Sequence, residues 1–195
     1  MATVTDPITL ALRVAAILER HGISYALGGS LASSMFGEPR GTIDIDMAIR
    51  LEHQQFNDLV DTLGIEFYVP AEAAQQAIEQ GTSFNLIDEA GLKVDLFVLG
   101  DSPLDRRQIE HRRRVMVQED PPQHLWVTAP AEQVLRKLEW YQAGGQVSER
   151  QWRDVVGILR TQGSTLDRAD LTQTAASMGL GALLDAALKD AEPST

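Results

Sequence analysis

Three aspartates are the first residues of this chain whose type and spacing could do chemistry. Asp44 and Asp46 lie within the segment 42–49, which alternates polar and apolar residues and so predicts a β-strand. Side chains two positions apart on a strand point to the same face, so this pair can bind one hard cation. Asp95 lies in a second apolar run, and on a neighbouring strand it would complete a cluster of three carboxylates. Because clustered carboxylates repel one another, they predict a divalent cation among them.

A glycine-rich turn precedes the aspartate pair. Gly28-Gly29-Ser30 follows a short apolar segment and leads into a segment with helical character, 31–36. The free N–H groups at the start of a helix form a natural phosphate site. A phosphate site and a carboxylate cluster in one chain predict nucleotide chemistry.

The composition of the chain excludes several other kinds of site. Its 195 residues allow one domain of ordinary size or two small halves, and 44% apolar residues argue against overall disorder. The absence of cysteine excludes disulfides, zinc–thiolate sites and thiol catalysis, while the four histidines show no ligand spacing and no P-loop motif occurs. With no secretion signal and no apolar stretch long enough to cross a bilayer, we expect a cytoplasmic protein without a membrane partner.

The charge of the chain is acidic overall but not evenly distributed. A net charge of −11 and a pI near 4.7 argue against binding of a long nucleic-acid duplex. Five arginines nevertheless fall within nine positions: Arg106, Arg107, Arg112, Arg113 and Arg114. Two interpretations stay open at this point. The arginines form either a solvated face that balances nearby acids, or a clamp for a triphosphate or the end of an RNA.

The order of the expected elements predicts an α+β fold. Strands are expected in six segments: 23–27, 42–49, 83–87, 92–99, 115–117 and 125–127. Helices are expected in four segments among these strands: 7–21, 31–36, 56–63 and 71–79. After Pro130 the pattern is helical throughout, in four segments: 131–143, 149–161, 168–178 and 180–189. We therefore predict a small mixed β-sheet core flanked by helices in residues 1–128 and a C-terminal helical bundle in residues 129–195, the two sharing one active-site cleft.

The two motifs together resemble a known superfamily. Gly28-Gly29-Ser30 with Arg40-Gly41-Thr42-Ile43-Asp44-Ile45-Asp46 resembles the signature of the nucleotidyltransferase superfamily that includes DNA polymerase β. Within it, residues 131–141 (AEQVLRKLEWY) and 148–159 (SERQWRDVVGIL) resemble the AbiEii/AbiGii-type toxin nucleotidyltransferases, and the resemblance covers most of the chain. It implies a magnesium-dependent enzyme, with up to two Mg²⁺ ions, that moves a nucleoside monophosphate from a nucleoside triphosphate to an acceptor hydroxyl.

The resemblance also implies roles for individual residues. Asp44, Asp46 and Asp95 would ligate magnesium, and Asp95 would help to deprotonate the acceptor hydroxyl. Lys137 and Asp154 match charged positions that line the cleft in the toxin-like branch and are assigned to catalysis. The residues implied to bind the nucleotide are Gly28, Gly29, Ser30, Arg40, Thr42 and Lys137.

Plainer roles stand beside three of these assignments. Asp95 could be a strand-end acid on a solvated face that it shares with Lys93. Lys137 could lie at the rim of a packed helix face. Asp154 could simply pair with Arg150 or Arg153.

The acceptor and the class of function stay open at the level of sequence. The arginines and the toxin-like C-terminal half favour an RNA end or a protein hydroxyl as acceptor, with a cognate antitoxin as the implied partner. The alternative enzyme modifies a small molecule such as an aminoglycoside. A non-catalytic module that binds a nucleotide or a protein on the same scaffold belongs to a different class of function. The presence of all three candidate acids does not favour that module.

Overall fold

The computed structural model describes residues 6–192 of the chain, which divides into two compact units. One unit comprises residues 1–31 and 42–128, and the other comprises residues 32–41 and 129–195. Helix α2 (Gly29–Phe36) begins in the first unit and ends in the second.

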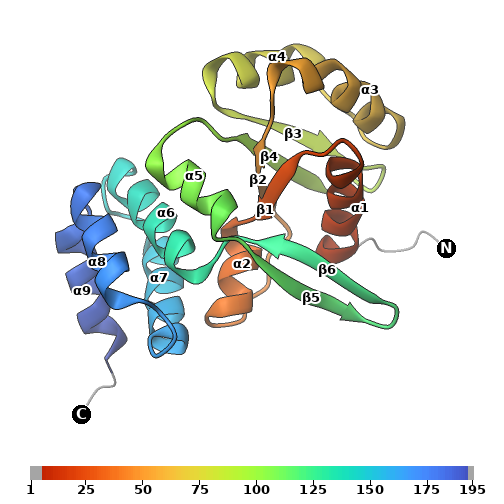
Figure 1. The fold of residues 1–195 in the computed structure, drawn as a ribbon. Coiled ribbons are helices and arrows are strands. Elements are labelled where there is room, and N and C mark those ends of the chain that lie inside the picture. Colours follow the sequence, from red (N-terminus) through yellow and green to blue (C-terminus); the bar gives the residue numbers. More distant parts are fainter. Residues whose placement is uncertain (1–5, 193–195) are drawn as a thin grey trace. The chain divides into compact units, whose positions relative to one another are not determined.

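The first unit is built on a six-stranded mixed sheet with the strand order β3-β4-β2-β1-β6-β5 (Figure 1). β2 pairs with β4, and β1 with β6, in parallel, whereas the other neighbours are antiparallel. The strands are β1 (Ser24–Leu27), β2 (Ile45–Arg50), β3 (Ser83–Ile87), β4 (Lys93–Val98), β5 (Arg113–Glu119) and β6 (Pro122–Val127). The predicted α+β fold with a mixed sheet is confirmed.

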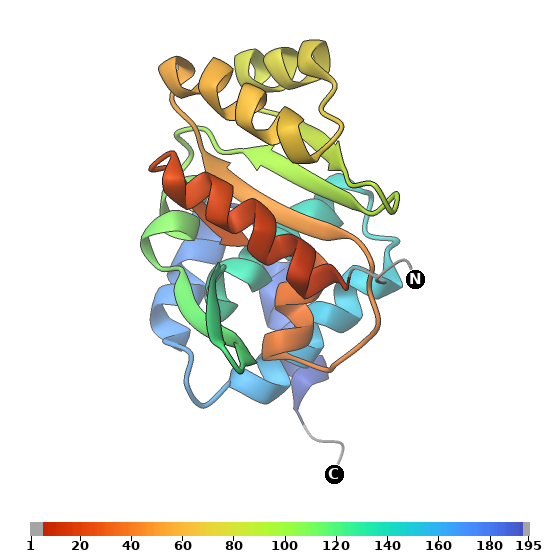
Figure 2. The same ribbon diagram turned by 90° about the vertical axis from the view of Figure 1, so that its right-hand side faces the viewer.

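One face of the sheet is apolar and covered by helix. The side chain of Asp6 accepts hydrogen bonds from the first N–H groups of α1 (Pro7–Arg20) and so fixes where this helix begins. α1 buries Leu10, Val14 and Leu18 and contacts β1 and β6, and Figure 2 shows it lying across the sheet. The other helices of this unit are α3 (Phe56–Glu66), α4 (Ala71–Gln80) and α5 (Pro103–Glu110).

The opposite face of the sheet carries the polar residues, as the strand register shows. Asp46 on β2 and Asp95 on β4 are paired positions, so their side chains point to the same side. Leu27 of β1 pairs with Met47 of β2 and with Val127 of β6, so these three side chains point to one side of the sheet. Because side chains alternate along a strand, the preceding residues Asp46 and Trp126 both point to the other side. Trp126 in turn pairs with Arg114 of β5. We call this side, defined by Asp46, Asp95, Trp126 and Arg114, the carboxylate face.

Several boundaries differ from those expected from the sequence. β2 begins at Ile45, so Asp44 lies just before the strand rather than within it. α3 continues through Gly64 to Glu66, because this glycine lies on an open side of the helix where a helical glycine costs only about 1 kcal/mol. α5 was not predicted: it buries only two apolar side chains, so its periodicity is weak, although Ser102 caps it and Pro103 begins it.

The second unit contains the helical C-terminal half of the chain. Its helices are α6 (Pro130–Ala143), α7 (Glu149–Gln162), α8 (Arg168–Ser177) and α9 (Gly181–Ala191), close to the segments expected from the sequence. The segment 32–41 packs directly on α7, since a Cβ at Gly37 would lie 3.0 Å from the backbone nitrogen of Ile158. Between residues 6 and 192, no helix has both the length and the apolar character needed to cross a bilayer.

Candidate functional site

The glycine turn and the Asp46 carboxylate are in direct contact. The Gly28 N–H donates a 2.8 Å hydrogen bond to the Asp46 carbonyl, and α2 begins at the next residue. Gly29 has a φ of +57°, and a Cβ built there would lie 1.7 Å from Asp46 Oδ2. Only glycine satisfies both conditions. The turn therefore brings the backbone at the start of α2 against the carboxylate, and Ser30 is the second residue of that helix.

The second carboxylate of the site comes from the neighbouring parallel strand. Asp95 pairs with Asp46 in the β2–β4 register, and adjacent strands lie about 4.8 Å apart. Asp44 is exposed and precedes β2, as does Thr42. The structure thus brings Asp46 and Asp95 to neighbouring positions at the end of the sheet where α2 begins.

A lysine shares this group of acids. Lys93 Nζ lies 2.8 Å from Asp95 Oδ2, with side-chain exposures of 45% and 18% for the lysine and the aspartate. The hydrogen bond from Lys93 to Asp95 raises the pKa of the lysine, and the negative charges of Asp95, Asp44 and Asp46 raise it further. The sequence suggested that Asp95 could be an acid on a solvated face shared with Lys93. In the structure these two side chains form an ion pair.

The residues of this site suit a hard divalent cation in kind. Carboxylate oxygens are the ligands that Mg²⁺ prefers, and two of the three expected donors are neighbours in the strand register. Across residues 6–192, however, no three acidic or imidazole side chains lie together in an arrangement that could hold a metal ion. At Asp95, the lysine ammonium lies against one of the two carboxylate oxygens.

Two buried polar residues lie beneath the turn and were missed in the sequence. Gln108 of α5 donates a 3.1 Å hydrogen bond from Nε2 to Thr128 Oγ1. Both side chains lie 3.8–3.9 Å from the position that a Cβ on Gly28 would occupy. The only signal for Gln108 was the Ser102-Pro103 helix start, because α5 is otherwise weakly patterned.

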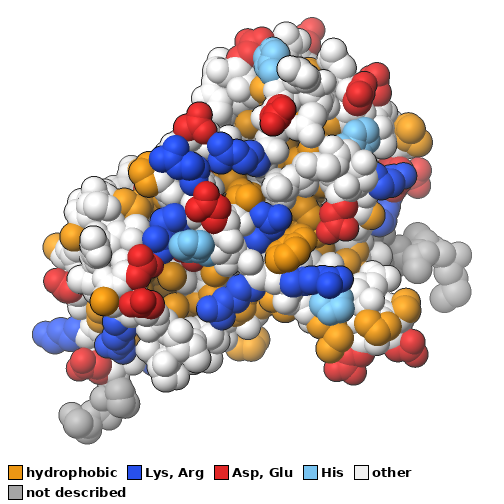
Figure 3. Space-filling model, viewed as in Figure 1, with side chains coloured by type: hydrophobic (Ala, Val, Ile, Leu, Met, Phe, Trp, Pro, Cys, Tyr) orange, Lys and Arg blue, Asp and Glu red, His pale blue; other side chains and the backbone are white. Residues whose placement is uncertain are grey.

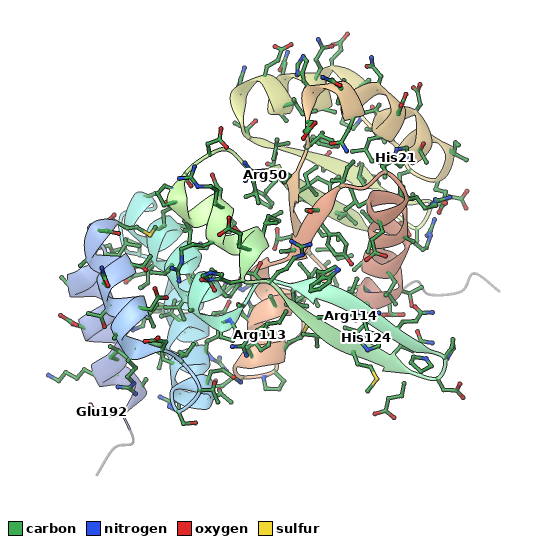
Figure 4. The ribbon with its side chains drawn as sticks, viewed as in Figure 1. His21, Arg50, Arg113, Arg114, His124 and Glu192 are labelled. Carbon is green, nitrogen blue, oxygen red and sulfur yellow. The ribbon has the colours of Figure 1, made fainter. Side chains whose placement is uncertain are left out.

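An arginine stacks on a tryptophan on the carboxylate face. The Arg112 guanidinium carbon lies 4.7 Å from the centre of the Trp126 ring, a cation–π contact, and Arg112 Nη1 donates a 2.7 Å hydrogen bond to the Ile109 carbonyl. Burial lowers the pKa of Arg112. Arg114 pairs with Trp126 across the strands and is exposed, and Figure 4 places Arg114 and His124 together on the hairpin.

The five clustered arginines lie on different elements of the first unit. Arg106 and Arg107 lie on α5, Arg112 stacks on Trp126, and Arg113 and Arg114 alternate to opposite sides of β5. Figure 3 shows basic side chains spread over the visible face of the hairpin and α5. The strand register thus places Arg114 on the carboxylate face.

In the second unit, Lys137 and Asp154 belong to a buried ion-pair group. Lys137 Nζ lies 2.8 Å from Asp154 Oδ2, and the Arg40 guanidinium donates two hydrogen bonds of 2.9 and 2.8 Å to the same carboxylate. Burial acts to raise the pKa of Asp154, but the hydrogen bonds and charges of Arg40 and Lys137 outweigh it and hold this pKa below its ordinary value. Asp154 pairs with these two residues and not with Arg150 or Arg153, the neighbours that the sequence suggested as partners.

Comparison with known proteins supports the fold. No family model and no curated protein matches the sequence. A crystal structure of an antigenic nucleotidyltransferase-like protein from Paracoccidioides brasiliensis matches 93% of this chain and 91% of its own, with 20% identity and a TM-score of 0.55. The solution structure of the antibiotic-resistance factor ANT(2'')-Ia matches 93% of this chain and 97% of its own, with 14% identity and a TM-score of 0.57. The chain therefore has a nucleotidyltransferase-like fold, while its place in the AbiEii-type branch stays a prediction.

Proposed function

We propose that this protein is a nucleotidyltransferase. An acceptor hydroxyl oxygen would attack the α-phosphorus of a nucleoside triphosphate, the bond to the bridging oxygen would break, and pyrophosphate would leave. The observation that carries this proposal is the packing of the Asp46 carboxylate against Gly29, at the start of α2. The likeness in fold to nucleotidyltransferase-like proteins supports it.

Different residues of the first unit would bind the phosphates, hold the cation and accept the proton. The first N–H groups of α2 and the Ser30 hydroxyl would bind the phosphates, because a helix N-terminus favours negative charge. Asp44, Asp46 and Asp95 would hold one or two Mg²⁺ ions, which when bound neutralise charge on the phosphates and align the reacting oxygens. Asp95 would take the proton of the acceptor hydroxyl.

For Lys137 and Asp154 we propose a positioning role. Both charged groups are buried and paired with each other, and Asp154 also binds Arg40. They would hold the guanidinium of Arg40, which belongs to the signature motif, in one orientation. Thr42, in the segment before β2, is a further residue that we propose to bind the nucleotide.

We propose RNA as the acceptor. Arg114 and Trp126 share the carboxylate face, and β6, which carries Trp126, is separated from β2 by a single strand. Exposed arginine beside an aromatic ring is the combination with which proteins bind single-stranded nucleic acid. In a chain with a net charge of −11, such a strip is a favourable place for a polyanion. A toxin role with an antitoxin partner would extend this proposal and rests on the sequence resemblance alone.

A second candidate is transfer to a small molecule. The likeness to the antibiotic-resistance factor ANT(2'')-Ia, which extends over nearly the full length of both chains, favours it. The two candidates share every residue of the nucleotide site and differ only in the acceptor.

The test is a labelling experiment with fractionated acceptors. Purified protein is incubated with Mg²⁺ and each α-labelled nucleoside triphosphate, together with the RNA, protein or small-molecule fraction of a cell lysate. We expect label in RNA with the wild-type protein and with Asp61→Asn, an exposed aspartate on α3, and none with Asp46→Asn. Label confined to the small-molecule fraction would select the second candidate, and labelling by Asp46→Asn would refute the site.

A further inference from the structure

Lys93 contacts Asp95, one of the carboxylates proposed to bind the metal. It is the first residue of β4, two positions before Asp95, so both side chains point to the carboxylate face. Its ammonium lies 2.8 Å from Asp95 Oδ2, the distance of a charge-assisted hydrogen bond. An ammonium at this distance weakens the binding of a divalent cation to the same carboxylate, because the two cations repel each other.

The lysine faces more than one acid. The charges of Asp44 and Asp46, as well as that of Asp95, act on its ammonium. Asp46 is the register neighbour of Asp95, so the negative charges lie on adjacent strands. Without a cation these carboxylates repel one another, and a fixed positive charge relieves part of that repulsion.

The Lys93 side chain can also be displaced from Asp95 at low cost. Lys93 is 45% exposed, while Asp95 is only 18% exposed. The lysine stem is flexible and its ammonium is strongly hydrated, so its release into water is inexpensive. An arginine in this place would form a bidentate pair with the carboxylate and would be harder to displace.

We propose that Lys93 is an internal counter-ion of the carboxylate cluster, which neutralises the acids in the metal-free protein and competes with the divalent cation for Asp95. Lys93 thereby sets how tightly the protein binds its cation. This inference rests on the proposed function, because it assumes that Asp46 and Asp95 bind the metal.

The test measures cation binding rather than turnover. Free Mn²⁺ is titrated into nucleotide-free protein and followed by its electron paramagnetic resonance signal. Loss of a partly exposed ion pair is worth a few tenths to about 1 kcal/mol, so we expect Lys93→Met to bind Mn²⁺ about two- to fivefold more tightly. The gap should close in about 1 M monovalent salt, which screens the pair.

Two matched variants separate competition from other effects. Lys93→Arg keeps the positive charge and should bind Mn²⁺ no more tightly than the wild type. Lys189→Met removes an exposed lysine of the second unit and should leave the affinity unchanged. In a thermal melt without metal, Lys93→Met should be less stable than the wild type, and Mn²⁺ should raise its melting temperature by more.

The outcomes distinguish this inference from the proposed function. Unchanged or weaker Mn²⁺ binding by Lys93→Met, with normal binding by the wild type, would overturn the competition and leave the metal site standing. Tightening by Lys93→Arg equal to that by Lys93→Met would overturn it as well, since the charge would then not be the cause. If neither the wild type nor Lys93→Met binds Mn²⁺, the metal site of the proposed function fails first.

Discussion

Replacement of Gly29 by alanine tests the contact that defines the site. An alanine there must adopt a φ near +57°, which costs about 1–2 kcal/mol for a residue with a Cβ. Its methyl group would also sit 1.7 Å from Asp46 Oδ2 and 2.5 Å from Asp46 Cγ, so the carboxylate must move. Relief of such overpacking costs about 1–3 kcal/mol, and the two effects together predict a loss of about 2–5 kcal/mol in the free energy of unfolding.

A matched glycine separates the backbone strain from the overpacking. Gly81 ends α4 with a φ of +62°, and no atom lies within 4 Å of the position its Cβ would take. Gly81→Ala should therefore cost only the backbone strain, about 1–2 kcal/mol. Urea unfolding of both variants gives the two free energies, and Mn²⁺ titration reports whether the Asp46 carboxylate has moved. We expect Gly29→Ala to lose more stability than Gly81→Ala and to lose Mn²⁺ binding as well. Equal losses with normal Mn²⁺ binding in both variants would refute the close packing of Asp46 on the turn.

Three further changes test other parts of the structure. Asp154→Asn leaves the buried ammonium of Lys137 without a charged partner and should lower the free energy of unfolding in urea by about 3–5 kcal/mol. Lys137→Met leaves Asp154 paired with Arg40 and should cost less. Equal costs would argue against the buried pair. Because the pKa of Asp154 is lower in the folded protein than its ordinary value near 4, its stabilisation is present above that value and is lost as the pH falls through the folded pKa, so the wild-type advantage over Asp154→Asn should shrink in acid melts. Arg114→Glu should weaken RNA binding and flatten its salt dependence while nucleotide binding stays normal, and an unchanged salt slope in a filter-binding assay would remove Arg114 from the acceptor strip.

The three acids of the proposed site could be selected from the sequence because their signal is local, and their role stays a prediction. The alternation around Asp46 and Asp95 defines strands, and the glycine turn defines the start of a helix. The fold class followed from the order of these elements and was confirmed. The prediction placed Asp44 inside the strand because 42–49 alternates without interruption, yet pairing with β4 begins only at Ile45.

The contacts that sequence patterns could not give are those between distant residues. Arg40 and Asp154 are separated by 114 positions, so the pattern suggested the nearer arginines as partners. Gln108 belongs to a helix with little apolar periodicity, and its contact with Thr128 depends on how that helix packs on the sheet. The pairing of Arg112 with Trp126 depends on the register of a hairpin whose strands were predicted only in part.

The position of a label in the products tests the central claim most directly. Purified protein is incubated with Mg²⁺ and RNA in two parallel reactions, one with α-labelled and one with γ-labelled nucleoside triphosphate. Nucleotidyl transfer predicts that the α label enters the RNA and the γ label appears in pyrophosphate, with neither product formed by Asp46→Asn. Entry of the γ label into the acceptor, or identical products from the wild type and Asp46→Asn, would contradict the account.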